Sequence, residues 1–536
     1  MTGSLAITLL AALGTALVLG AVAHRLRMPP MVGYIAAGLL VGPFTPGYVA
    51  DREEVQGLAD IGVALLMFSI GIRFRLEELV EVGRLVLIGA PLQVAVTMTL
   101  GASVALLAGG TLVEALFLGA VVSICSSVVL VKVAGESTLE TSAHGRLALS
   151  WSIAQDLITV LLVVVLSAIA VESDRPVVDA LVATALAAAF VAAVLVVGSR
   201  VLPAVLARVA QLGSRELFVV AVAVVAIGTA AAAGLVGVSV ALGAFVAGLA
   251  LAESDLAASV LGEIVPLREL FATIFFVSVG VLLAPTAVVA GWPMVLALLA
   301  VLVLGKLLPI AAIVLAGGYR PQTALRTGAL VAQGGEFSFV LATVGLQVGA
   351  LDGGRFSEAM GAVVLSILLA APVASLAARM GARLDRRYAA ARTGAEESPA
   401  AGLRRHVVIA GYGVVGRTVA RHVEGRGVPW VAVDNDYRLA SAARAGGTPV
   451  IFGDAGTPSV LDFARIATAS TFVLAIPDPL ATRQAVLHAR SRNERLHIAA
   501  RAHSVAEEVE LRRLGVARVI TAERQVGNEL VRDVLG

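Results

Sequence analysis

A single carboxylate stands inside an apolar stretch that is long enough to cross a bilayer. Asp156 lies in the run from Trp151 to Leu166, and no lysine or arginine lies within one helical turn of it. A charge at membrane depth costs on the order of a few kcal/mol, so such a residue is usually retained for a function. We therefore predict that Asp156 binds a cation or a proton.

A second charge at membrane depth is the ammonium of Lys306, in the run from Val303 to Pro309. Its own helix supplies no acid. We expect Lys306 to approach Asp156, where its positive charge would ease the release of a proton. The alternative is a structural ion pair that holds two helices together, and the two roles are compatible.

Polar residues and glycines interrupt two other apolar stretches, near 112–133 and 325–349. We expect the helices to unwind there and to expose backbone carbonyls, which with serine oxygens would replace part of a cation's water shell. The alternative is an ordinary helix-packing face of small residues. The residues concerned are Ser126, Ser127, Gly334, Gly335 and Glu336.

The chain from about residue 404 onward carries a dinucleotide-binding fingerprint. A β-branched strand, a G-x-G-x-x-G loop, a helix and a second strand follow one another, and an acid comes about twenty residues after the loop. The glycines allow backbone amides to approach a phosphate, and the acid can accept hydrogen bonds from ribose hydroxyls. The predicted nucleotide-binding residues are Gly411, Tyr412, Gly413, Val414, Val415, Gly416, Arg417, Asp434, Asn435, Asp454, Ala455 and Arg501.

Asp454 and Arg501 follow later strands of this domain, so we expect both to face the crevice at the carboxyl ends of the strands. Arg501 there either binds a phosphate or is solvated. No substrate-binding half follows before Gly536, so we expect nucleotide sensing and no enzymatic activity.

The elements that must position these groups are apolar spans. The 536 residues are 58% hydrophobic and 15% charged, and the apolar excess is confined to residues 1–380. A membrane span needs about 17–25 apolar residues, and this length criterion gives about thirteen candidate spans. They lie near 5–23, 30–43, 57–73, 85–108, 112–133, 147–171, 179–200, 216–234, 237–253, 269–285, 292–316, 325–349 and 358–380.

Loop charges predict the orientation of these spans. Loops on the side of the C-terminus hold most of the arginines, whereas the opposite loops hold only Arg52, Arg175 and Arg355. The positive-inside rule then places the C-terminus in the cytoplasm and the N-terminus outside. Three domains follow: a transmembrane exchanger over 1–380, a linker over 381–403 and a Rossmann-like nucleotide-binding domain over 404–536.

The order of the spans suggests an internal duplication, in which spans one to six correspond to spans eight to thirteen. An odd offset inverts the second unit relative to the first, as in many secondary transporters. By this correspondence, the interrupted spans five and twelve are equivalent. The fold class we predict is therefore a polytopic α-helical membrane protein with an inverted repeat, joined to a cytoplasmic α/β domain.

Several stretches together resemble the monovalent cation:proton antiporter family two, in its Kef/YbaL-type branch. They are Pro30–Gly38 with Gly42-Pro43-Phe44, Gly213–Phe218, Phe275–Gly280, Gly305-Lys306, Ala332–Phe337 and Arg501-Ala502-His503. The resemblance covers nearly the whole chain. It implies an antiporter fold of the NhaA/NapA type and a C-terminal RCK (KTN) domain.

The resemblance also implies roles for single residues. The carboxylate matching Asp156 carries the ion and proton, and the lysine matching Lys306 is its partner. Gln155 replaces an acid found in other members, which favours electroneutral exchange. The expected cation is K⁺, with Na⁺ as the alternative, the expected regulator is AMP or NAD(H), and the expected assembly is a homodimer in the bacterial inner (plasma) membrane, with no nucleic acid.

The loop after the ninth span lacks the His-Ala-Leu-Glu run of glutathione-gated members, so we do not expect glutathione control. Two other classes of protein remain as alternatives. A nucleotide-gated K⁺ channel would need a carbonyl filter resembling Thr-Val-Gly-Tyr-Gly, and the sequence contains no such run. A membrane oxidoreductase would need a catalytic partner for the nucleotide.

Overall fold

The computed structural model divides the chain into two compact units. The first comprises Met1–Glu136, Leu147–Ile313 and Leu325–Leu376, and the second comprises Ser137–Arg146, Val314–Ala324 and Ala377–Gly536. The structure describes residues 2–26, 28–45, 52–73, 83–135, 142–169, 186, 189–236, 239–392, 398–476, 478–502, 505–521, 524–525 and 531–532.

One group of helices in the first unit combines an early and a late triplet. Its members are α1 (Thr2–Arg25), α2 (Pro30–Val41), α3 (Arg52–Arg73), α12 (Arg215–Leu235), α13 (Val240–Ala252) and α14 (Ala257–Leu282). Helix α3 packs against α13 and α14, and α2 packs against α14. A Cβ atom at Gly71 would lie 2.2 Å from the carbonyl oxygen of Phe245, so glycine permits this close helix contact.

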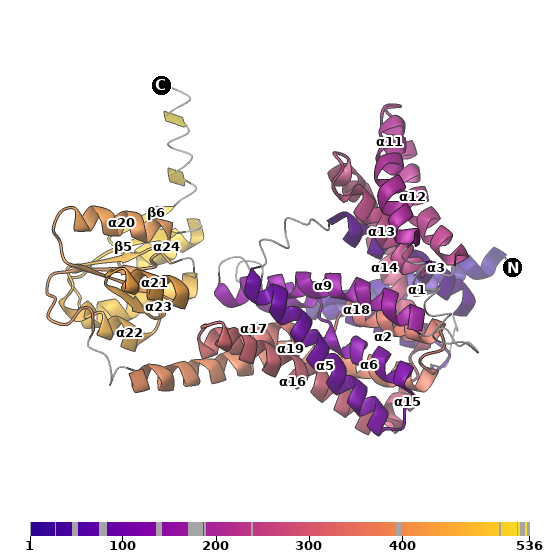
Figure 1. The fold of residues 1–536 in the computed structure, drawn as a ribbon, viewed down its shortest axis with the longest axis horizontal. Helices are drawn as coiled ribbons and strands as arrows, with labels where there is room; N and C mark the ends of the chain where they lie inside the picture. The colour runs from indigo at the N-terminus through magenta and orange to yellow at the C-terminus, as the bar shows by residue number, and fades with distance from the viewer. Residues whose placement is uncertain are drawn as a thin grey trace. The chain divides into compact units, whose positions relative to one another are not determined.

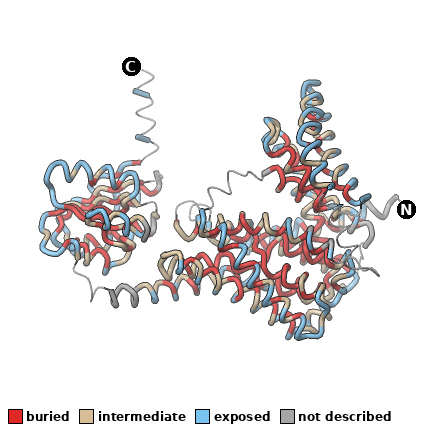
Figure 2. Tube along the Cα trace, viewed as in Figure 1, coloured by how far each residue is buried: buried red, intermediate tan, exposed pale blue. Residues whose placement is uncertain are grey.

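A second group, most of which lies in the same unit, again combines an early and a late set (Figure 1). Helix α5 packs against α6, and α6 packs against α18. The interior of this group is buried (Figure 2). The members are α5 (Arg84–Leu107), α6 (Leu112–Ser123), α7 (Ser127–Ala134), α9 (Ala143–Ile169), α16 (Trp292–Ala316), α17 (Pro321–Val331), α18 (Glu336–Gln347) and α19 (Gly353–Arg392).

A π-helical turn, η1 (Val194–Gly198), continues into α11 (Ser199–Ala210), and the short α15 (Pro285–Ala290) lies between α14 and α16. Both groups of helices draw one set from each half of the chain, which is the arrangement that the predicted duplication requires. In both halves, the interrupted helix falls at the predicted place.

Each predicted span overlaps an apolar helix. Within the described ranges, 9 helices are long and apolar enough to cross a membrane, and α17 and α18 form a further pair that is bent by 43° at its break. The three other predicted spans overlap shorter apolar helices, Pro30–Val41, Gly57–Ile72 and Val240–Ala252. The polytopic helical class is confirmed, while the number of helices that cross the membrane stays a prediction.

The second unit contains a parallel sheet in the order β3-β2-β1-β4-β5-β6. Its hydrophobic core includes Val408, Val431, Phe472 and Ile498, all fully buried. The order reverses between β1 and β4, which is the switch point of a doubly wound fold. The strands are β1 (Val407–Ala410), β2 (Trp430–Asp434), β3 (Val450–Phe452), β4 (Thr471–Leu474), β5 (His497–Ala502) and β6 (Arg518–Thr521).

Helices connect these strands and confirm the predicted Rossmann-like alternation. They are α20 (Val414–Glu424), α21 (Tyr437–Ala445), α22 (Pro458–Phe463), the 3₁₀ turn η2 (Ile466–Thr468), α23 (Pro479–Arg492) and α24 (Val505–Arg513). The predicted linker over 381–403 begins as helix, because α19 continues to Arg392. Residues 393–397 of that prediction lie outside the described residues.

Candidate ion site and nucleotide-binding site

The first interrupted helix unwinds where the serines predicted it. Helix α6 ends at Ser123, and α7 begins at Ser127. Between them, Ile124 and Ser126 have extended backbones, with ψ angles of 148° and 126°. The hydroxyl of Ser126 accepts a hydrogen bond from the backbone N–H of Val129 and so caps α7. The Ser126 hydroxyl is therefore occupied as the N-cap of α7.

The second interruption lies between α17 and α18 and contacts the first. A Cβ atom on Gly335 would lie 2.4 Å from the Cβ of Ser126, so only glycine fits at this crossing. The backbone N–H of Gly334 donates to the hydroxyl of Ser366 at 2.9 Å. These contacts bring the two predicted breaks together in the interior of the second helix group.

The side chain of Gln333 joins the two interrupted segments through hydrogen bonds. Its side-chain amide donates to the carbonyl of Ser126 at 2.8 Å, and its side-chain oxygen accepts from the N–H of Ser126 at 3.3 Å. The backbone N–H of Ser126, freed by the unwinding, is therefore satisfied inside the protein, as an apolar environment requires, and the carbonyl of Ser126 also accepts from the N–H of Leu130. Gln333 was not among the predicted site residues, although a glutamine beside two glycines at membrane depth is the signal that could have identified it.

Lys306 bridges the same two breaks. Its buried ammonium donates to the carbonyl of Ile124 at 2.8 Å and to the carbonyl of Gln333 at 2.6 Å. The first carbonyl lies at the C-terminal end of α6 and the second just beyond the end of α17, where helix dipoles favour a cation. In the described part of the chain, no ion pair joins Lys306 to Asp156. Their pairing stays a prediction.

Gln155 lies away from the cavity beside Asp156, where a cation ligand would be expected. Its side chain is fully buried, and its oxygen accepts a hydrogen bond from the N–H of Cys125 at 2.8 Å. Its side-chain amide donates to the side-chain oxygen of Gln93. Gln155 is therefore occupied in holding the unwound segment, and it does not line the cavity beside Asp156.

Gln93 is the centre of this polar network, and sequence reasoning missed it. Its oxygen also accepts from the indole N–H of Trp151 at 3.1 Å, and its amide donates to the carbonyl of Ser123 at 3.2 Å. A neighbour on α5, Thr97, donates to the carbonyl of Gly305 at 2.7 Å. A lone glutamine in the apolar run 84–107 was the available signal. The network fixes α5, α9 and α16 around the first break.

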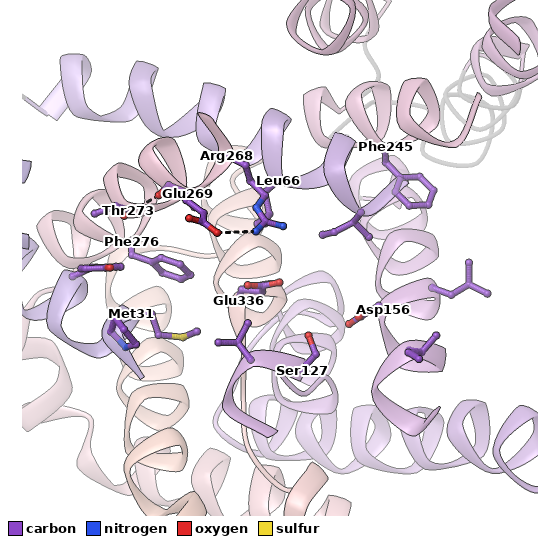
Figure 3. A pocket seen from close by; sticks show the side chains of 17 residues that line it. Met31, Leu66, Ser127, Asp156, Phe245, Arg268, Glu269, Thr273, Phe276 and Glu336 are labelled. Carbon is purple, nitrogen blue, oxygen red and sulfur yellow. Dashed lines mark hydrogen bonds and ion pairs between the residues drawn. The ribbon is translucent and has the colours of Figure 1, made fainter. Parts of the chain in front are cut away.

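Asp156 faces a cavity of about 670 Å³ that also contacts Ser127 and Glu336. Figure 3 shows these three side chains directed toward one another from α9, α7 and α18. The Oδ1 atom of Asp156 is buried and has no hydrogen-bond partner. A buried carboxylate oxygen without a donor is suited to hold a proton or a bare cation. Ser126, in contrast, does not line this cavity.

An ion pair on α14 also contributes to the lining of this cavity. The guanidinium of Arg268 lies 3.5 Å from the carboxylate of Glu269 and donates to the hydroxyl of Ser69 at 3.4 Å. Both charged residues lie on α14 and line the cavity. The charges of this pair offset each other, while α9 and α18 contribute the carboxylates of Asp156 and Glu336 to the lining.

The glycine-rich loop of the second unit has the geometry of a phosphate site. Gly411 has a φ angle of +92°, a conformation that favours glycine. A Cβ atom on Gly416 would lie 1.8 Å from the carbonyl oxygen of Gly411, so α20 can pack this closely only with glycine there. Val414 and Val415, the first residues of α20, are exposed. The N-terminus of α20 is thus open to an anion.

Asp434 ends β2 beside this loop. Its carboxylate accepts from the N–H of Tyr412 at 2.5 Å and from the N–H of Asp436 at 2.8 Å. Burial raises the pKa of Asp434, and these two hydrogen bonds act in the opposite direction. Asn435, next along the chain, is exposed. The acid therefore lies where a ribose bound beside the loop would contact it.

Asp454 and Arg501 lie at the carboxyl edge of the sheet but on opposite sides of the switch point. Three strands separate β3 from β5, so the two strands are about 19 Å apart at about 4.8 Å per strand. Asp454 accepts from the N–H of Gly456 at 2.8 Å, and Ala455 beside it is buried. The Nε atom of Arg501 is buried without a hydrogen-bond partner. The two residues therefore belong to different halves of the crevice.

Comparison with known proteins decides the family. Residues 12–377 match the family described as sodium/hydrogen exchanger, transmembrane, which spans more than half of the chain. The chain belongs to this family. Residues 407–522 match the TrkA-N domain, in agreement with the predicted nucleotide-binding unit. The predicted family resemblance is confirmed.

Relatives of this exchanger align with nearly its whole length. The chain is 34% identical over 535 residues to the "Putative cation/proton antiporter YbaL" of Escherichia coli (strain K12), covering 98% of this chain and 96% of the relative. It is 28% identical over 507 residues to the "Glutathione-regulated potassium-efflux system protein KefC" of Salmonella heidelberg (strain SL476), covering 94% and 81%.

A solved structure is similar in fold. The sodium proton antiporter MjNhaP1 from Methanocaldococcus jannaschii aligns with a TM-score of 0.53 and 16% identity, over 71% of this chain and 98% of that one. At this identity the likeness concerns the fold alone. The predicted antiporter fold is confirmed.

Proposed function

We propose that this exchanger moves a monovalent cation, K⁺, against protons by alternating access, with Asp156 as the carrier of both. One observation carries the proposal: the buried Oδ1 atom of Asp156 has no hydrogen-bond partner and faces the cavity between the two helix groups. A carboxylate in this setting is stabilised by binding either a proton or a cation. Because the two compete for one group, cation and proton flow in opposite directions.

The surroundings of Asp156 supply what a hard cation needs. Ser127 contributes a hydroxyl to the cavity, and the unwound segments keep polar backbone at membrane depth. Lys306 and Gln333 hold the two unwound segments in register through hydrogen bonds. The carboxylate is therefore presented on a fixed framework, and movement of one helix group against the other would change its access.

The TrkA-N domain is proposed to regulate exchange by binding AMP or NAD(H). The phosphate would lie at Gly411, Gly413 and the N-terminus of α20, near Arg417, and the ribose would lie at Asp434. A nucleotide changes transport only if its affinity differs between the two access states. The domain would thus act as a sensor of nucleotide.

The membrane arrangement is also a proposal. The loop charges favour a cytoplasmic C-terminal domain and an outer N-terminus in a bacterial inner membrane. The expected assembly is a homodimer, as the family resemblance implies. Cysteine accessibility on either side of the first described span would test the orientation.

The experiment is a flux assay in proteoliposomes that contain a pH-sensitive dye. An imposed K⁺ gradient should move protons in wild-type vesicles and fail to do so with Asp156→Asn, while nucleotide binding is retained. Parallel gradients of Na⁺ and Rb⁺ distinguish K⁺ from Na⁺ exchange, and AMP or NADH tests regulation. Proton-coupled cation flux that persists in Asp156→Asn contradicts the assignment of Asp156. Flux of K⁺ without proton movement indicates a channel.

A further inference from the structure

The loop that joins α16 to α17 contacts the edge of the nucleotide-binding sheet. This loop belongs to the second unit, which includes Val314–Ala324 together with the TrkA-N domain. The guanidinium carbon of Arg320 lies over the ring of Phe452, 4.8 Å from its centre. A Cβ atom on Gly453 would lie 3.0 Å from Nη2 of Arg320. Arg320 therefore packs against the chain where β3 ends.

Carboxylates from two elements favour the positive charge of Arg320. Asp454 follows Gly453 after β3, and Asp385 lies on α19. Burial lowers the pKa of the Arg320 guanidinium, while the carboxylates of Asp454 and Asp385 act in the opposite direction. An arginine that has both an aromatic face and acidic neighbours is suited to hold separate elements together.

The same loop starts the first half of an interrupted span, because Pro321, the first residue of α17, directly follows Arg320. The carboxylate of Asp385 accepts a hydrogen bond from the backbone N–H of Gln322 at 3.0 Å, so α19 caps the first turn of α17. A Cβ atom on Gly381 would lie 2.7 Å from the Cα of Gln322, which places α19 and α17 in close contact. The start of α17 is therefore fixed to α19 and, through Arg320, to β3.

Helix α17 connects this contact to the interrupted segments. It has 11 residues and ends at Val331, two positions before Gln333, whose side chain binds Ser126. At about 1.5 Å per residue, α17 is about 16 Å long. The hydrogen bonds of a helix make it move as one body, so a movement of its first turn would reach Gln333.

The other side of the contact adjoins the proposed nucleotide site. Phe452 pairs with Asp434 in the register of β3 and β2, and the N–H of Gly453 donates to the carbonyl of Asp434 at 2.7 Å. Asp434 is the acid at which the ribose is proposed to bind. A nucleotide that moved the carboxyl end of β2 would therefore move the chain that Arg320 covers.

We propose that Arg320 is the positioning residue through which nucleotide bound beside Asp434 acts on α17 and so changes the rate of exchange. This inference rests on the proposed function, and it names the contact that transmits the proposed regulation. Coupling requires the contact between Arg320 and Phe452 to differ between the two access states. Removal of Arg320 should therefore leave the nucleotide site and the ion site in place and uncouple them.

The test is the effect of AMP and of NADH on K⁺-driven proton flux in proteoliposomes made with the full chain. The quantity measured is the ratio of the exchange rates with and without saturating nucleotide, which in the wild type should be about fivefold or more from one, in either direction. Arg320→Gln should bring this ratio to within about 1.5-fold of one, with a Kd for AMP within about fivefold of the wild type. Arg320→Lys, which keeps the charge and loses the planar face, should give an intermediate ratio.

Phe452→Leu removes the ring from the other side of the contact and should also bring the ratio toward one. The matched control is Arg383→Gln, which removes the same charge from an exposed position of α19, two residues before Asp385. Its ratio should equal that of the wild type. A monodisperse preparation that exchanges K⁺ for protons without nucleotide shows that a variant is folded.

Three outcomes overturn the inference. One is a wild-type ratio in Arg320→Gln, and another is an equal loss of the ratio in Arg383→Gln, which would indicate a general effect of charge. The third is loss of AMP binding in Arg320→Gln, which would make Arg320 a ligand of the nucleotide. Failure of the proposed function is separate, since it would be seen without any change at Arg320: as exchange that survives Asp156→Asn, or as wild-type exchange that responds to neither nucleotide.

Discussion

Substitution of Gly335 tests whether contact between the two unwound segments is needed for transport. A Cβ atom there would lie 2.4 Å from the Cβ of Ser126 and 2.7 Å from its Cα and N. Carbon atoms prefer separations of about 3.5–4.0 Å, so the shortest contact is at least about 1 Å too close. The backbone of Ser126 cannot yield easily, because Gln333 binds both its N–H and its carbonyl. The segments must therefore separate.

Overpacking of this kind costs about 1–3 kcal/mol, which corresponds to about a 5- to 140-fold change in an equilibrium constant. The cost arises from contact alone, since the φ of −153° at Gly335 suits any residue. If the other access state lacks the contact, Gly335→Ala shifts the population by this factor and slows exchange at least about fivefold.

Gly334→Ala is the matched control for this experiment. Its added Cβ would lie 2.8 Å from Cγ1 of Val363, a side-chain methyl of the neighbouring helix, whereas the contact at Gly335 is with the backbone of Ser126. We expect its exchange rate to stay within about threefold of the wild type in the same dye assay. Wild-type exchange by Gly335→Ala, or equal losses in both variants, would refute the reasoning that the crossing at Ser126 is tight and functional.

Two further predictions concern Lys306 and Asp434. Lys306→Met should lower the free energy of unfolding by about 2–4 kcal/mol in thermal or denaturant unfolding of the detergent-solubilised protein, because two buried carbonyls lose a charged donor; unchanged stability would contradict the bridging role. For Asp434, burial raises the pKa, so its carboxylate is lost at a higher pH on acidification than that of an ordinary aspartate. AMP binding followed by calorimetry should therefore weaken as the pH falls, and Asp434→Asn should bind weakly with little pH dependence; a wild-type profile in that variant would contradict the ribose contact.

Much of the proposed ion site could be predicted from residue type alone. An aspartate and a lysine at membrane depth are conspicuous in an apolar sequence, and paired glycines beside a glutamate mark a break. The glycine-rich loop could also be identified from the sequence, because its glycine spacing and the strand and helix on either side of it lie within one short stretch of chain. These features depend on short stretches of chain, so the sequence is sufficient to locate them.

The partners of these residues could not be predicted in the same way. Lys306 binds carbonyls from two breaks 182 and 27 residues away, and Gln155 binds a backbone N–H 30 residues away. Such pairings are determined by how separate helices pack, which no local pattern encodes. For the same reason Glu336 was expected only to support a break, although it shares the cavity with Asp156.

We propose that one carboxylate, that of Asp156, binds either a cation or a proton. The most direct test of this proposal is the release of protons when K⁺ is added to weakly buffered, purified protein, measured over a range of pH. We expect about one proton to be released per K⁺ bound where Asp156 is protonated, and none from Asp156→Asn. Binding of K⁺ without proton release, or equal release from that variant, would contradict it.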